Sequence, residues 1–223
     1  MKKHYLVLSG LALSTLLFTA PASAGNTTTN PVTKTAAAAT TLPVNTEAST
    51  MKWNAKKVGG EHYGTIKLAN GALQVKGTKL TGGSFTIDMN TIVVEDITRA
   101  DSNKRLTDHL KSDDFFSVEK HPAATFTITK ATLLKVKTGE NYSITGNLTI
   151  KGITHPITFP ATVTINGKSA TAAATIEVDR TKYDIKYRSG LVGTAADKII
   201  YDNFTIDLKL TAGETAGKQL GTK

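Results

Sequence analysis

Apolar and polar residues alternate along much of the chain, most clearly between residues 142 and 165. In residues 142–150 (YSITGNLTI) and 157–165 (ITFPATVTI), nearly every second position is apolar and the positions between are mostly polar, threonine above all. A period of two places alternate side chains on opposite faces of a strand, so the pattern indicates two half-buried antiparallel strands. Lys151-Gly152 lies between them, and because glycine adopts a positive φ at little cost, we expect a hairpin turn there.

The same alternation predicts at least eight short strands in all. Besides the hairpin, we expect them in residues 51–58, 65–68, 73–75, 84–90, 125–130, 170–179 and 202–210. Asn70-Gly71 predicts a further hairpin turn. Only residues 101–111 show helical spacing, with Leu106 and Leu110 at i and i+4. Aromatic residues make up 6% of the chain and form no girdle at strand ends. We therefore expect an all-β fold, a soluble eight-stranded antiparallel barrel with one short helix.

The two ends of the chain differ in composition from its middle. Residues 1–24 begin with lysines, continue with a short apolar run and end in A-S-A, which is typical of a cleaved signal peptide. Residues 25–49 are rich in Thr and Ala, so we predict a flexible linker there. The barrel is expected at residues 50–212, followed by a disordered tail at 213–223. The chain has no cysteine to carry a lipid or a disulfide, and we expect a periplasmic or secreted protein.

The formal net charge is +9, and it falls by two, to +7, when Lys2 and Lys3 leave with the signal peptide. The remaining basic residues are spread singly, and no basic run interleaves with aromatic residues. We therefore expect no nucleic-acid partner, whereas transient contact with an anionic membrane surface stays open. The sequence leaves the oligomeric state open.

Candidate catalytic residues are few. His62, His109, His121 and His155 show no metal-ligand spacing, and there is no G-x-S-x-G motif, phosphate-binding loop or cysteine nucleophile. We expect no enzymatic activity, metal or cofactor. One alternative stays open, namely a haem-handling, metal-handling or enzymatic protein that uses His109, His121 or His155 on the same barrel.

Small residues fall on the presumed inward rows at Gly146, Ala161, Ala172 and Ala174. An eight-stranded barrel is wide enough to be filled by its own side chains or to hold one small ligand. The small residues predict either empty volume for a ligand or a close approach of neighbouring elements, and the pattern does not decide between them. A scaffold with a solid core is therefore a second alternative.

Three segments resemble the signatures of the YceI-like proteins. These are residues 104–116 (KRLTDHLKSDDFF), 146–156 (GNLTIKGITHP) and 179–185 (DRTKYDI), although Asp184 replaces the glycine usual in the third. The opening strand, residues 53–62, keeps only an aromatic residue and a histidine of the family pattern. The resemblance implies an extended, lipocalin-like barrel of eight strands. It also implies a long apolar pore that holds a polyisoprenoid or isoprenoid-quinone-like lipid in an exported bacterial protein.

The hypothesis that follows is an exported carrier of an amphiphilic isoprenoid lipid. Inward parity and the resemblance select as pore lining Phe85, Ile87, Met89, Phe126, Ile128, Ile144, Leu148, Ile157, Phe159, Ile176, Phe204, Ile206 and Leu208. Leu106, Leu110, Phe115 and Phe116 are expected to cover one side or end. Arg180 is expected either to meet the lipid headgroup or to form a structural ion pair with an aspartate. Parity alone does not separate pore lining from plain core.

Overall fold

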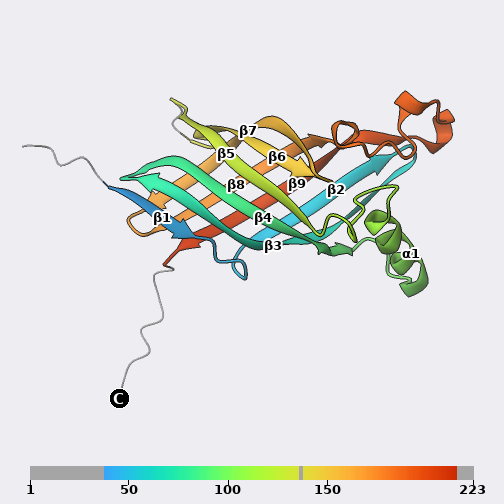
Figure 1. Ribbon diagram of the computed structural model, residues 1–223, viewed down its shortest axis with the longest axis horizontal. Helices are drawn as coiled ribbons and strands as arrows, with labels where there is room; N and C mark the ends of the chain where they lie inside the picture. Colours follow the sequence, from blue (N-terminus) through green and yellow to red (C-terminus); the bar gives the residue numbers. More distant parts are fainter. Residues whose placement is uncertain (1–37, 136–137, 215–223) are drawn as a thin grey trace, which may run out of the picture. The chain divides into compact units, whose positions relative to one another are not determined.

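The computed structural model describes residues 38–135 and 138–214, which fold mainly into strands (Figure 1). The strands are β1 (Ala39–Pro43), β2 (Thr50–Lys57), β3 (Gly60–Lys76), β4 (Lys79–Val94), β5 (Ala123–Leu133), β6 (Tyr142–Ile150), β7 (Ile153–Asn166), β8 (Ser169–Asp179) and β9 (Ile200–Gly213). The helices are α1 (Ala100–Lys111) and the short 3-10 turns η1 (Arg180–Tyr183), η2 (Gly190–Val192) and η3 (Ala196–Lys198).

Eight of these strands close into an antiparallel barrel. The order is β3-β2-β9-β8-β7-β6-β5-β4, and β4 pairs back to β3 to complete the ring. The predicted fold class, an eight-stranded antiparallel barrel with one α-helix, is therefore confirmed. In the part of the chain that the structure describes, no helix has both the length and the apolar character needed to cross a membrane.

β1 lies where a flexible linker was predicted. Residues 39–43 pair with residues 72–76 of β3, and Leu42 is buried. Val44 then bridges to Ala212 of β9. β1 therefore lies between β3 and β9, and from Thr50 onward β2 lies between the same two strands. The predicted boundary at residue 50 was too late, because two apolar side chains in a Thr-rich run are enough to hold a short strand on a sheet that is already formed. The predicted signal peptide and the rest of the linker lie outside the described residues, as does the predicted tail beyond Glu214.

Two turn predictions had opposite outcomes. Lys151 and Gly152 both adopt positive φ (52° and 74°), and they form the predicted β6–β7 hairpin. The predicted hairpin at Asn70-Gly71 is wrong, since β3 runs straight through it. A Cβ atom on Gly71 would lie 2.7 Å from Cδ1 of Phe85, so the glycine permits a close strand approach instead of a turn. The chain reverses later, at Gly77, where φ is 61°.

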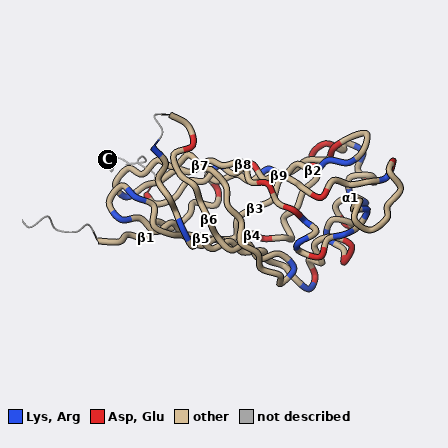
Figure 2. The backbone as a smooth tube through the Cα atoms, turned by 90° about the horizontal axis from the view of Figure 1, so that it is seen from above, with Lys and Arg blue, Asp and Glu red and all other residues tan. Residues whose placement is uncertain are grey.

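The helix lies at one end of the barrel, where it packs beside β4 (Figure 1). It begins at Ala100, one residue before the predicted start. Leu106 and Leu110 on α1 and Phe116 just after it pack against the barrel core. Figure 2 shows charged residues gathered around this end and at the turns, whereas the middle of the barrel carries few of them.

Candidate ligand-binding tunnel

The barrel encloses two apolar cavities that share part of their walls. The cavity next to α1 has a volume of about 130 Å³, and the second, toward the other end of the barrel, has a volume of about 110 Å³. Five residues line both, namely Met51, Ile87, Leu148, Val178 and Ile206. The two cavities therefore adjoin, and we refer to them together as the tunnel.

The small inward residues explain the tunnel only in part. Ala161, Ala172 and Ala174 line the second cavity, so at these positions the small side chains leave volume. Gly146 behaves differently, because a Cβ atom there would lie 2.6 Å from Cε2 of Phe126 and would clash with its ring. Both predicted uses of small residues thus occur in one barrel. The interior is not a solid core.

The structure places all but one of the predicted binding residues on the tunnel wall. Those on the first cavity alone are Met89, Leu110, Phe115, Phe116, Arg180 and Phe204. Those on the second alone are Phe85, Phe126, Ile128, Ile144, Ile157, Phe159, Ile176 and Leu208. Ile87, Leu148 and Ile206 line both. Leu106 is the exception: it packs against the core but lines neither cavity.

Sequence reasoning missed several residues of the first cavity. Trp53 lines it together with Met51 and Ala55, which share its parity on β2, so alternation in this strand could have revealed them. Ile185 and Tyr201 also line it, but they come from the irregular segment after β8 and from the start of β9. The alternation of Tyr183, Ile185 and Tyr187 is the one signal in that segment, and it is too short to predict a strand.

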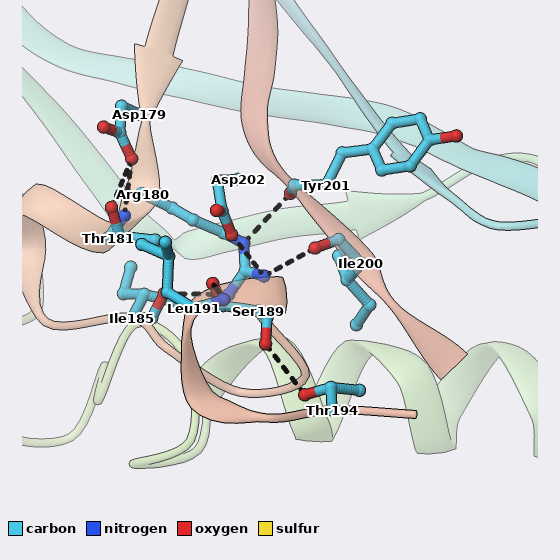
Figure 3. A network of polar contacts seen from close by, with 10 residues as sticks. All are labelled: Asp179, Arg180, Thr181, Ile185, Ser189, Leu191, Thr194, Ile200, Tyr201 and Asp202. Atoms are coloured by element: carbon cyan, nitrogen blue, oxygen red, sulfur yellow. Dashed lines mark hydrogen bonds and ion pairs between the residues drawn. The ribbon is translucent and has the colours of Figure 1, made fainter. Parts of the chain in front are cut away.

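Arg180 is buried at the edge of the first cavity and is bonded mainly to backbone (Figure 3). Its Nε donates to the Tyr201 carbonyl (3.1 Å), Nη1 to that of Ile185 (2.8 Å) and Nη2 to that of Ile200 (2.9 Å). Nη2 also lies 3.3 Å from the Asp202 carboxylate. Burial lowers the pKa of the guanidinium and Asp202 partly opposes that shift, yet arginine stays charged in proteins. The geometry shows the structural ion pair, the second of its two predicted roles.

The segment from residue 180 to residue 199, which we call the cap, covers the α1 end of the barrel together with α1. The Arg180 side chain bonds the cap to the start of β9, at Ile200 and Tyr201, and to Ile185 within the cap. Tyr187 packs its ring edge-on against His109 of α1 (centroids 4.7 Å apart) and beside Phe115 (5.5 Å). Because Leu110 of α1, Phe115 just after it and Ile185 of the cap line the first cavity, the cap and the α1 region form its end wall.

The histidines of the alternative hypothesis lie outside the tunnel lining. His109 contacts Asp114 (3.0 Å), and the ring of His155 meets that of Tyr183 edge-on at 5.5 Å. His121 lies beside Gly152. Across residues 38–135 and 138–214, no three or more His, Asp or Glu side chains come together in a group that could hold a metal ion. These contacts do not favour the alternative.

Comparisons with known proteins agree with this architecture. A family model described as "YceI-like domain" matches residues 42–212. A UPF0312 protein of Pectobacterium carotovorum subsp. carotovorum is 32% identical over 146 residues, which cover 66% of this chain and 65% of that protein. The chain thus matches slightly less than two thirds of that relative's length.

Two solved structures share the fold. BcnA of Burkholderia cenocepacia superposes with a TM-score of 0.60 at 23% identity, covering 76% of this chain and 99% of BcnA. A polyisoprenoid binding domain from Saccharophagus degradans, implicated in plant cell wall breakdown, superposes with a TM-score of 0.53 at 13% identity. That match covers 78% of this chain and 98% of the domain. At these identities the likeness shows the fold.

Proposed function

The chain belongs to the YceI-like family, and from this premise we propose that it is an exported binding protein for an amphiphilic isoprenoid lipid of the polyprenyl or isoprenoid-quinone type. The observation that carries the proposal is the tunnel. Every residue that lines the second cavity is apolar, and the one charged residue of the first, Arg180, is already bonded to carbonyls and a carboxylate. The proposed role is binding, not catalysis.

Such a lining selects a ligand by apolar area and shape. A water-sized group needs roughly 10–15 Å³, so the second cavity, at about 110 Å³, has room for about seven to eleven methylene-sized groups. Each buried CH₂ contributes about 0.8 kcal/mol, which amounts to roughly 7 kcal/mol before the costs of association. The Saccharophagus degradans domain has the same fold and is described as polyisoprenoid-binding, which supports this ligand class.

The two cavities differ in a way that orients an amphiphile. The second cavity offers no polar side chain, whereas Tyr201, which carries a phenol hydroxyl and is half exposed, lines the first. A buried polar headgroup without hydrogen bonds is costly. We therefore place the tail in the second cavity and the headgroup toward the cap.

Solvent extraction of the purified full chain, followed by mass spectrometry, tests the proposal directly. We expect a prenyl lipid in stoichiometric amount. For protein stripped of lipid, Trp53 is a built-in reporter because it is the sole tryptophan of the sequence and lines the first cavity. A prenylated benzoquinone should quench its fluorescence saturably, and the same quinone without a tail should bind far more weakly. Protein that is isolated empty and shows no saturable quenching would refute the proposal.

Contact with an anionic membrane is part of the proposal, and the cap offers the surface for it. Leu191 and Val192 at η2 are 75% and 54% exposed, and the exposed Lys186 and Arg188 precede them in the cap. Glutamate at both apolar positions should abolish cosedimentation with phosphatidylglycerol vesicles. Leu133, 54% exposed at the opposite end of the barrel, gives the matched control Leu133→Glu, which should bind as wild type. Equal loss in both variants would rule out this surface.

Export is proposed from the sequence pattern of residues 1–24. Expression of the full chain in a bacterium should yield, in the periplasmic or culture fraction, a protein whose intact mass corresponds to a start at Gly25. Recovery of only the unprocessed chain from the cytoplasm would contradict it.

A further inference from the structure

The backbone ladder between β7 and β8 is incomplete. The two strands pair only from Thr162↔Ala173 to Asn166↔Ser169. Beyond that point, residues 153–161 of β7 pair with β6 alone, and residues 174–179 of β8 pair with β9 alone. Among the described barrel strands this is the longest stretch in which neighbours leave each other unpaired. We call it the seam.

The side chains on each lip of the seam are bonded away from it. On β7, Thr158 shares a hydrogen bond with Thr145 of β6 (2.9 Å between hydroxyl oxygens). On β8, the Thr175 hydroxyl donates to Asp207 of β9 (2.6 Å). Within the described chain, no residue of 153–161 is in register with a residue of 174–179, and no side-chain hydrogen bond of Thr158 or Thr175 crosses between them. The hydrogen bonds of each lip are therefore made with its outer neighbour and not with the other lip.

The sequence of β7 explains why the ladder stops. Pro156 and Pro160 both lie in its unpaired part, and proline has no backbone N–H to donate. The register with β6 continues through both of them, opposite Asn147 and Ser143. The missing donors therefore weaken the side that faces β8, as prolines do at sheet edges.

The inner edges of the seam are walls of the tunnel. Ile157 and Phe159 on β7 and Ala174 and Ile176 on β8 all line the second cavity. The seam thus separates the place assigned to the lipid tail from the outside of the barrel.

Near the cap, Tyr183 of η1 covers the seam, and it is held there mainly by packing and not by hydrogen bonds. Tyr183 of η1 is buried with its ring against that of His155 on β7, and its hydroxyl has no hydrogen-bond partner among the described residues. A hydrogen bond also links the β6–β7 turn to the cap: Lys151 Nζ donates to the Asp184 carbonyl (3.2 Å), and this bond is exposed to solvent. Parting the lips breaks none of the paired positions of the β7–β8 ladder.

The geometry points to the seam as the route by which the tail enters and leaves the tunnel sideways, an inference that rests on the proposed lipid-binding function. Passage through the α1 end would thread the tail lengthwise past the cap, where Arg180 holds Ile185, Ile200 and Tyr201. Passage through the seam moves the tail sideways between residues 153–161 and residues 174–179, which form no ladder pairs with each other.

A reversible staple tests this route, and the cysteine-free chain makes it clean. Continuing the β7–β8 register places Thr158 opposite Glu177, and both side chains are exposed on the outer face. Thr158→Cys with Glu177→Cys is linked by a bismaleimide that contains a reducible disulfide. Uptake of a prenylated benzoquinone from phosphatidylcholine vesicles is followed by Trp53 quenching. We expect the staple to slow uptake at least tenfold, to leave the final amplitude unchanged, and to release its effect on reduction.

Two further staples serve as controls. Thr164→Cys with Thr171→Cys links an exposed pair in the part of β7 and β8 where the two strands are paired. The uptake rate of this stapled variant should stay within twofold of wild type. Asn90→Cys with Lys111→Cys ties α1 to β4, where Lys111 Nζ already donates to the Asn90 carbonyl (2.7 Å). If this staple slows uptake and the seam staple does not, the route lies under α1 and the inference is wrong. If unstapled protein shows no quenching at equilibrium, the proposed function itself fails.

Discussion

Replacing Ala174 with tryptophan should block the tunnel while leaving the barrel folded. Ala174 lines the second cavity from β8, opposite Leu208 on β9. An indole has about nine non-hydrogen atoms, and the cavity, at about 110 Å³, accommodates roughly seven to eleven water-sized groups. The new side chain should therefore take the place that we assign to the lipid tail.

Two free energies fix the size of the effect. Displacing about eight methylene-sized groups removes roughly 6 kcal/mol of gross tail burial at about 0.8 kcal/mol each. Even if half of that is recovered by a shifted tail, about 3 kcal/mol remains, which is at least a 100-fold loss of affinity. For folding, an overpacked side chain costs about 1–3 kcal/mol, and burial of the indole offsets a similar amount. At roughly 2–4 °C per kcal/mol for a domain of this size, the Tm should move by less than about 6 °C.

The assay combines a lipid titration with a thermal melt. Because the new indole would complicate the Trp53 signal, binding is measured by retention of a radiolabelled prenyl lipid after gel filtration, and the Tm by circular dichroism. Ala173→Trp is the matched control, since Ala173 is exposed on the outer face of the same strand and pairs with Thr162. It should bind lipid as wild type does. Outright unfolding of Ala174→Trp would mean that the site is packed core, and wild-type affinity would mean that the tail lies elsewhere.

Three further substitutions test the structure around the tunnel. Arg180→Ala should lower the free energy of unfolding by about 3–5 kcal/mol in urea, because buried acceptors lose their donor, whereas exposed Lys182→Ala should change it by less than about 0.5 kcal/mol. Burial raises the pKa of Asp96, but its hydrogen bond with His62 (2.7 Å) contributes to a net lowering. The stability from this carboxylate is present above about pH 4 and is lost as pH falls through the lowered pKa, so Asp96→Asn should flatten the acid limb of a stability–pH curve. Gly146→Ala should cost about 1–3 kcal/mol, because its Cβ would collide with an aromatic ring and a backbone oxygen; an unchanged melt would contradict the close packing seen there.

Most of the residues that alternation selects lie on the tunnel wall, because parity is a local property. Each strand shows which side chains share a face, and a barrel has only two faces, so inward rows such as those of β6 and β9 could be read directly. The prediction failed where tertiary contacts outweigh local pattern. Leu42 is buried because residues 72–76 of β3 offer a free edge on which β1 pairs, next to Ala212 of β9. Asn70-Gly71 forms no turn because Phe85 packs against the glycine and the strand continues.

Whether a small inward residue leaves volume depends on cross-strand register, which parity does not contain. Gly146 pairs with Ile128, and Phe126, two residues away on the same face, lays its ring over the glycine, so no space remains there. Ala161 pairs with Tyr142, whose hydroxyl accepts a hydrogen bond from the Leu80 backbone N–H (3.2 Å), so that ring is drawn toward β4 and the alanine stays on the cavity wall. The two positions look alike in the sequence and differ only in where the nearest large side chain is anchored. The tunnel therefore follows from the closure of the barrel, and substitutions at such anchors should change its capacity as strongly as substitutions in its lining.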